Sequence, residues 1–113
     1  MIAEQLKSLL EALGYPVAND VYTGAAKEYL VFNFQTIPSN FADDEPQHER
    51  ILVQVHLFAR HTVSTTKLEK QIKRVLFEAG YTWPNRMNAT EETRSSTGTT
   101  RHIVFECETA GTL

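Results

Sequence analysis

The sequence contains four histidines, and imidazole nitrogen is the commonest side-chain ligand for metal ions in proteins. His56 and His61 are five residues apart along an expected strand, so their side chains point to opposite faces. His48 and His102 lie far away in the sequence, and a site that uses them needs a tertiary convergence that the spacing does not indicate. We therefore expect no metal site and no bound cofactor.

Three consecutive carboxylates, Asp43, Asp44 and Glu45, form the second group with chemical potential. Neighbouring carboxylates can act in acid–base catalysis or bind calcium through their oxygens. The run lacks the alternating acidic spacing and the turn glycine of a calcium loop. It lies within residues 38–47, where two prolines and many polar residues predict a long exposed loop. We interpret the run as a solvated acidic loop or a charged docking surface.

Other catalytic patterns are not found in the sequence. The five glycines are isolated from one another, so no glycine-rich phosphate loop is present. The serines occur in capping or loop contexts without a nucleophile-elbow motif. Cys107 is the only cysteine, which excludes an intramolecular disulfide and favours a small core residue. We expect that the protein is not an enzyme.

Phe77 is the most informative residue of the second expected helix. At about 100° per residue it points away from the apolar stripe, into a face that carries Lys70, Lys73 and Arg74. A large aromatic side chain among cations on an outer helix face is typical of a protein-contact anchor. The alternative is a single exposed phenylalanine, or one covered by a loop.

The same cations, together with Lys67, have three candidate roles. They can bind phosphate, form an ordinary solvated face relieved by Glu69 and Glu78, or contact the acidic run of a neighbouring subunit. We favour solvation over phosphate binding. A contact between two different surfaces of one chain is head-to-tail, and it builds a ring if the rotation between copies closes.

Two segments have the apolar spacing of amphipathic helices. The first is expected over residues 2–13, with Gly14 as its stop, and its stripe consists of Ile2, Leu6, Leu9, Leu10 and Leu13. The second begins where Thr66 and Glu69 have the spacing of a capping box, and it stops at Gly80. Its expected stripe is Leu68, Ile72, Val75, Leu76 and Ala79.

Five segments are expected to be strands. Three precede the second helix, at residues 17–21, 29–37 and 51–58, and two follow it as a hairpin, at residues 82–94 and 101–109. The order α-β-β-β-α-β-β predicts an α+β fold, with two helices packed on one face of a mixed or antiparallel sheet.

Composition limits the classes of protein. A chain of 113 residues with 42% hydrophobic content suffices for one core, so a single domain over residues 1–113 is expected. No apolar stretch approaches the roughly 20 residues that span a bilayer, and no secretory signal pattern is present, so we expect synthesis in the cytosol and no membrane partner. A net charge of −3 gives no global basic field, so no sequence-specific nucleic acid is expected.

The order of the segments resembles the small tail-completion, or tail-terminator, proteins of long-tailed phages and prophages. The resemblance rests on an N-terminal helix ending in Leu-Gly-Tyr-Pro-Val, a Tyr-Leu-Val-Phe-Asn-Phe strand, an acidic loop and a Leu-Val-Gln-Val-His-Leu-Phe strand. A Ser/Thr-capped helix and a hairpin ending in Arg-His-Ile-Val-Phe-Glu follow. It covers nearly the full length and consists of strand and helix patterns, without an invariant catalytic signature.

The resemblance implies a protein that caps the growing tail tube, ends its polymerisation and presents the head-joining surface. Such proteins form hexameric rings, often after existing as monomers in solution, and they contact the tail-tube protein and a head–tail connector. The expected location is the host cytoplasm during assembly and then the virion tail.

No functional residue transfers from that family, so the interface candidates rest on physical grounds alone: Asp43, Asp44, Glu45, Lys70, Lys73, Arg74 and Phe77. Two alternatives stay open. One is another neck or head–tail connector component, which would differ only in the partner that its surfaces recognise. The other is a small ligand-binding α+β domain or enzyme, which would need polar side chains converging in a concave pocket.

Overall fold

Over the residues that the structure describes, the fold has two helices and five strands in the order predicted from the sequence. The computed structural model describes residues 2–42, 45–91 and 100–112. Along the chain the elements are α1 (Ile2–Glu11), β1 (Val17–Asn19), β2 (Tyr29–Ala42), β3 (Glu45–Arg60), α2 (Thr66–Glu78), β4 (Asn85–Asn88) and β5 (Thr100–Thr112). The predicted α+β class and element order are confirmed. Among the described residues, no helix is long and apolar enough to cross a membrane.

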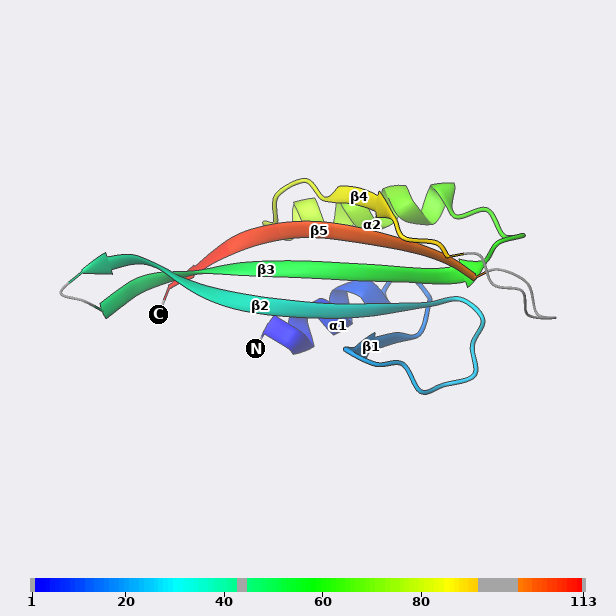
Figure 1. The fold of residues 1–113 in the computed structure, drawn as a ribbon, viewed down its shortest axis with the longest axis horizontal. Helices are drawn as coiled ribbons and strands as arrows, with labels where there is room; N and C mark the ends of the chain where they lie inside the picture. The colour runs from blue at the N-terminus through cyan, green and yellow to red at the C-terminus, as the bar shows by residue number, and fades with distance from the viewer. Residues whose placement is uncertain (1, 43–44, 92–99, 113) are drawn as a thin grey trace.

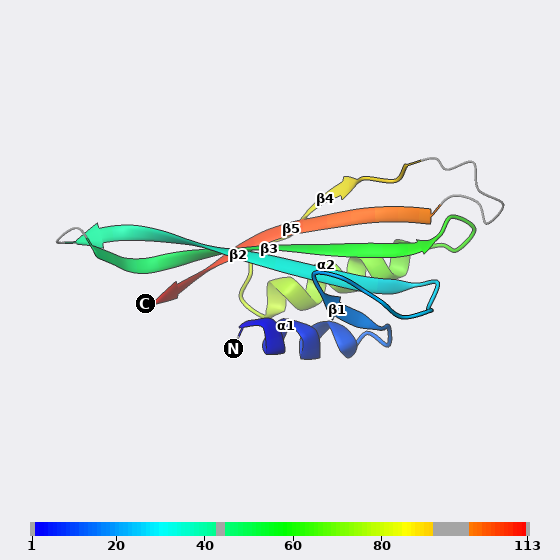
Figure 2. The same ribbon diagram turned by 60° about the horizontal axis from the view of Figure 1, so that its bottom comes forward.

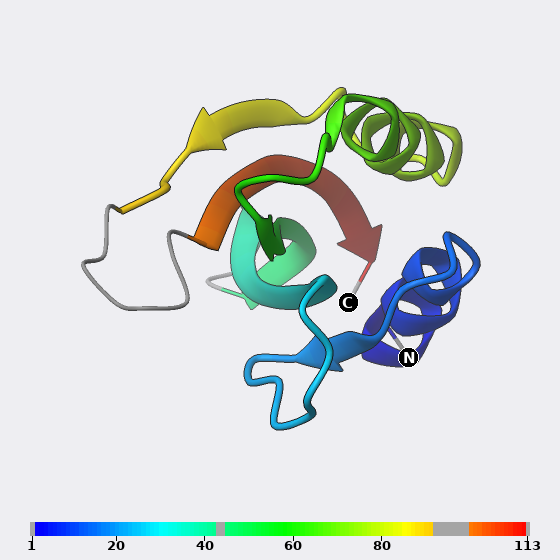
Figure 3. The same ribbon diagram turned by 90° about the vertical axis from the view of Figure 1, so that its right-hand side faces the viewer.

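The strands form one mixed sheet with the order β1-β2-β3-β5-β4. β1 is parallel to β2, and the other neighbouring pairs are antiparallel. Both helices lie on the same face of this sheet, as the end-on view in Figure 3 shows. β5 pairs with β3 on one side and with β4 on the other, so the last strand of the chain occupies an interior position.

The hydrophobic core lies between the helices and one face of the sheet. Alternate residues of β3 are buried and turn toward the helices, whereas the residues between them are half-buried on the opposite face, which we call the open face. The most completely buried side chains are Leu6, Leu10, Leu30, Phe32, Val53, Val55, Leu57, Ile72, Leu76, Ile103 and Phe105. Each large apolar side chain buried in this way contributes about 1.5–3 kcal/mol of transfer free energy.

The C-terminal end of α2 follows the prediction for Gly80. Gly80 has φ of +102°, a left-handed conformation that glycine adopts without steric cost. The Tyr81 amide donates to the Leu76 carbonyl and the Gly80 amide donates to the Phe77 carbonyl, each at 3.1 Å. This pair of hydrogen bonds is a Schellman motif. Ala79, expected in the buried stripe, is exposed because it is the C-cap residue beyond the last turn.

The N-terminal end of α2 differs from the prediction. The capping box expected between Thr66 and Glu69 is wrong, because the N-cap residue is Thr65 and no side chain caps the helix. Instead the Thr65 hydroxyl donates to the Glu69 carboxylate at 2.7 Å. Glu69 also accepts a hydrogen bond from Arg86 in β4, so its carboxylate joins the N-cap residue to the sheet.

Residues 38–47 are the largest correction to the predicted fold. Over residues 38–42 and 45–47 the expected long loop is instead the end of a hairpin, because β2 continues to Ala42, β3 begins at Glu45, and these two residues pair; residues 43–44 lie outside the described part of the chain. The Leu30 amide donates to the Pro16 carbonyl, and the Phe32 carbonyl accepts from the Asp20 amide. Every second residue of β2, counted from Leu30, therefore turns its backbone N–H and C=O away from β3. Pro38 belongs to that series, and its missing N–H therefore falls on the free edge.

The hairpin end projects from the rest of the molecule. We call residues 38–42 and 45–47 the hairpin arm, since β5 pairs with β3 only from His48 onward. Figure 1 shows the arm extending along the long axis beyond both helices and β4. The molecule is accordingly elongated, with extents of 58 × 26 × 23 Å.

The two shorter strands also differ from their predicted ranges. β1 ends at Asn19 instead of residue 21, because Asp20 has φ of +68° and leaves the extended conformation. Of the expected strand 82–94, residues 92–94 lie outside the described part of the chain, and in the rest β4 covers only Asn85–Asn88. It pairs antiparallel with β5, as the hairpin prediction requires. The predicted connection at residues 95–100 lies, apart from its last residue, outside the described part of the chain.

Candidate functional site

The outer face of α2 carries an exposed aromatic pair. Phe77 is 49% exposed, as its helical position predicted, and Trp83 is 48% exposed. Their rings meet edge to face, with centroids 5.4 Å apart and planes at 67°. The guanidinium carbon of Arg74 lies 5.4 Å from the Trp83 ring centroid, within the range of a cation–π contact. Phe77, Trp83 and Arg74 form what we call the aromatic–cation patch.

A groove of about 700 Å³ lies beside this patch. Its lining consists of Leu13, Lys67, Lys70, Gln71, Lys73, Arg74, Val75 and Trp83. We call it the α2 groove. It combines apolar surface with four cations, three of them predicted as interface candidates. Glu78 is 4.0 Å from Arg74, and because both are more than half exposed, this ion pair contributes only about 0–1 kcal/mol. The groove therefore keeps its positive character.

Trp83 is the member of this site that sequence reasoning missed. The available signal was the only tryptophan of the chain, three residues after the glycine that ends α2. Tyr81 is buried in the core, whereas Trp83 turns outward to Phe77 on the last turn of the helix.

Of the three acidic candidates, the structure describes the backbone of Glu45 alone, and it lies in a different part of the molecule. Asp43 and Asp44 are outside the described residues, and Glu45 is the first residue of β3 at the end of the hairpin arm. In Figure 2 the arm is at one end of the molecule and α2 lies behind the wider part of the sheet. The fold therefore does not bring the acidic end of the arm to the cations of α2 within one chain.

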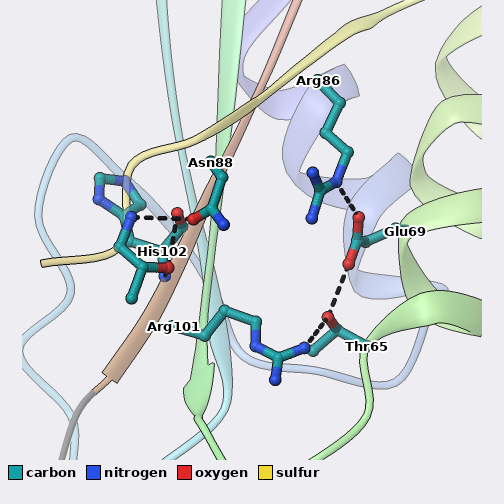
Figure 4. A network of polar contacts seen from close by, with 7 residues as sticks. Thr65, Glu69, Arg86, Asn88, Arg101 and His102 are labelled. Atoms are coloured by element: carbon teal, nitrogen blue, oxygen red, sulfur yellow. Dashed lines mark hydrogen bonds and ion pairs between the residues drawn. The ribbon is translucent and has the colours of Figure 1, made fainter. Parts of the chain in front are cut away.

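A polar network ties the start of α2 to β4 and β5 (Figure 4). Glu69 is 9% exposed and accepts hydrogen bonds from Thr65 and Arg86. Arg101 in β5 donates to the Thr65 hydroxyl at 3.1 Å and to the His61 carbonyl at 2.9 Å. Burial opposes ionisation of Glu69, but the hydrogen bonds from Arg86 and Thr65 and the charge of Arg86 together lower the pKa of its carboxyl. The network fixes the orientation of α2 on the sheet.

The open face of the sheet brings together two of the four histidines. His56 Nδ1 lies 2.8 Å from His102 Nε2, and the Asn33 side-chain amide lies 3.1 Å from His56 Nε2. The register explains this contact, because His102 pairs with Phe58 and is thus a diagonal neighbour of His56. Sequence spacing did not indicate the convergence, since it depends on pairing between strands separated by α2 and β4.

The histidine pair ends a row of stacked rings across the open face. The row runs from Tyr22 through Tyr29, Phe58 and His102 to His56, with successive centroids 4.2, 5.0, 4.3 and 5.0 Å apart. A depression of about 430 Å³ lies along the row, and Asp20 and Asn33 contribute to its lining. In the described part of the chain, no three His, Cys, Asp or Glu side chains form a group that could hold a metal ion.

Comparisons with known proteins bear on the fold. No protein-family model matches the sequence, and no curated protein matches it. A solved structure whose name states no function has a TM-score of 0.61 to this chain, with 13% identity over 99% of this chain and 90% of its own. This likeness shows the fold alone, because the identity is low.

Proposed function

We propose that this protein is a structural tail-completion protein of a phage or prophage, which caps the tail tube, ends its polymerisation and provides the head-joining surface. The observation that carries the proposal is the hairpin arm, which projects along the long axis beyond both helices. A capping protein acts through the surfaces by which it meets other subunits, and a projecting two-stranded arm can reach a neighbour without disturbing the core.

The resemblance of the segment order to tail-terminator proteins supports the proposal, and so does the α2 face. The aromatic–cation patch exposes two large rings beside Arg74, a combination enriched at the centres of protein interfaces. The arm and the α2 face are two different surfaces of one chain. Contacts between such surfaces are head-to-tail and generate rings when the rotation closes. The proposed partners are copies of this chain, the tail-tube protein and a head–tail connector.

One observation favours a second candidate function, a small ligand-binding protein. The depression on the open face brings His56, His102 and Asn33 beside a row of aromatic rings. Polar groups that converge in a concave site with aromatic walls are typical of ligand pockets. The rings of the row stack on one another, however, so the faces of the inner rings are already covered by their neighbours.

The first test of the proposal is the mass of the purified protein across concentration, measured by light scattering with negative-stain imaging. The measurement is made on the protein alone and mixed with tail-tube protein. Six-fold rings, or tubes capped at one end, are the expected result. A monomer at all concentrations that leaves tubes uncapped would contradict the proposal and favour another connector role or the ligand-binding alternative.

Phe77→Glu tests the patch within the same assay. Because Phe77 is half-exposed, the variant should remain folded by circular dichroism but assemble or cap tubes less well. Met87→Glu is the matched control, since Met87 is 51% exposed and pairs with Val104 of β5. Equal assembly of both variants and the wild type would remove Phe77 from the interface.

A further inference from the structure

We propose that the α2 groove receives the acidic end of the hairpin arm of a second copy of this chain. The inference rests on the proposed ring-forming function and names the contact that would build the ring. Its three supports are the charge of the two surfaces, the apolar content of the groove and the inability of the arm to reach its own groove.

Charge complementarity is the first support. The groove is lined by Lys67, Lys70, Lys73 and Arg74, although the whole chain has a net charge of −3. A concentration of positive charge on an acidic protein is a local feature that attracts an acidic partner. The largest acidic run in the sequence is Asp43-Asp44-Glu45, and its last residue, Glu45, begins β3 at the end of the hairpin arm. The chain therefore carries both members of a complementary pair.

The apolar content of the groove is the second support. Leu13, Val75 and Trp83 contribute apolar surface to its lining, and the Phe77 ring contacts Trp83 edge to face. A site for free anions or phosphate needs no such surface, whereas a protein segment that carries both charge and apolar groups does. The sequence of the arm supplies this mixture, because Phe41 and Ala42 directly precede the acidic run.

Geometry excludes the contact within one copy. β2 and β3 stay paired as far as Ala42 and Glu45, so the arm is a two-stranded ribbon that cannot fold back without losing backbone pairs. Figure 1 places its end at one extreme of the long axis, beyond α2. The acidic end can therefore meet an α2 groove only on another copy. Since the two surfaces differ, each copy inserts its arm into one neighbour and receives the arm of the other neighbour. Repetition of this contact closes a ring if the rotation between copies allows it.

A charge-swap experiment tests the contact in the full-length protein. The groove variant carries Lys67→Glu, Lys70→Glu and Arg74→Glu, and the arm variant carries Asp43→Lys, Asp44→Lys and Glu45→Lys. Lys73 is left unchanged because it is half-buried and its charge favours the ionised form of Glu69. Each variant alone places like charges at every junction, so the concentration for half-assembly should rise by about tenfold or more.

Mixing the two variants in equal amounts gives the decisive measurement. An alternating ring joins every acidic arm to a basic groove and every basic arm to an acidic groove, so assembly should return to within about threefold of the wild type. Rings in the mixture should contain even numbers of subunits. Lys7→Glu with Lys27→Glu is the control, because it makes the same kind of change at exposed positions outside the groove and should leave assembly unchanged.

The outcomes separate this inference from the proposed function. Rescue on mixing, with circular dichroism showing that both variants are folded, supports the contact. Wild-type rings or capped tubes combined with no rescue would overturn the contact and leave the tail-completion proposal standing. A wild-type protein that neither self-associates nor caps tubes would overturn both. If a triple variant does not fold, Lys70→Glu and Asp44→Lys are mixed instead, with the same criterion of rescue at a smaller amplitude.

Discussion

His56 and His102 lie on adjacent strands, and Nδ1 of His56 is 2.8 Å from Nε2 of His102. At this distance one nitrogen donates a hydrogen and the other accepts it, which requires at least one neutral ring. Burial lowers the pKa of His56, and the charge of His102 lowers it further. Burial also lowers the pKa of His102, whereas Glu91 opposes that shift. The folded protein therefore favours uncharged imidazoles, although Glu106 opposes the shift of His56.

The first prediction concerns the pH dependence of stability. Because the folded-state pKa values are lowered, the unfolded state binds protons more tightly, and stability from this pair is fully present above about pH 6.5. It should decrease as the pH falls from about 6.5 through the folded-state pKa values. Urea unfolding across this range should show a smaller decrease for His102→Gln than for the wild type. His61→Gln is the control, and an unchanged slope in His102→Gln would exclude the pair as the cause.

The second prediction concerns Cys107. Its side chain is buried, and burial raises the pKa of the thiol to about 12, so very little thiolate is present at neutral pH. A disulfide reagent should therefore modify folded protein far more slowly than urea-unfolded protein. The rate should increase with urea in proportion to the unfolded fraction. Rapid labelling without denaturant would show that β5 opens locally.

The third prediction concerns Glu69. Glu69→Ala removes the carboxylate that accepts hydrogen bonds from both Thr65 and Arg86. Because hydrogen bonds to charged groups contribute about 1.5–3 kcal/mol, we expect the free energy of unfolding to decrease by that amount. Chemical denaturation measures the loss. Glu78→Ala on the same helix should change stability by no more than about 0.5 kcal/mol, since its pair with Arg74 is exposed. Equal effects of the two substitutions would mean that the network does not stabilise the fold.

The fourth prediction concerns Gly80. A Cβ at this position would meet no heavy atom within 4 Å, so the cost of Gly80→Ala is the left-handed backbone itself. We expect a loss of about 1–2 kcal/mol on thermal or chemical unfolding. Gly80→Asn should lose less, because asparagine adopts this conformation more readily than alanine. A neutral Gly80→Ala substitution would indicate that the end of α2 can change its conformation at little cost.

Local patterns predicted the helices and the central strand well. The spacing of Leu6 and Leu10, and of Ile72 and Leu76, appears directly as burial against the sheet. The alternation from Ile51 to Phe58 also appears as one buried and one half-buried face. These features succeed because side-chain direction within one element depends only on its own period.

Features that depend on pairing between distant segments could not be predicted in this way. Pro38 indicated a loop because proline cannot donate in a ladder, yet its position on the free edge of β2 makes that donor unnecessary. The expected capping box failed because the N-cap is Thr65, four residues before Glu69, and the Glu69 carboxylate binds the Thr65 hydroxyl and Arg86 of β4 instead. The contact of His56 with His102 required the β3–β5 register, which no local pattern contains.

The interior position of β5 also determines when the molecule can become complete. β2 and β3 are consecutive in the sequence, so their hairpin can form early from local contacts. β5, at residues 100–112, is the last of the described elements to be synthesised. Until it emerges, the inner edge of β3 has no strand to pair with, and the core lacks Ile103 and Phe105. A nascent chain can thus extend its arm before its core is closed. Chaperone contact or aggregation during synthesis should accordingly be greatest just before β5 emerges.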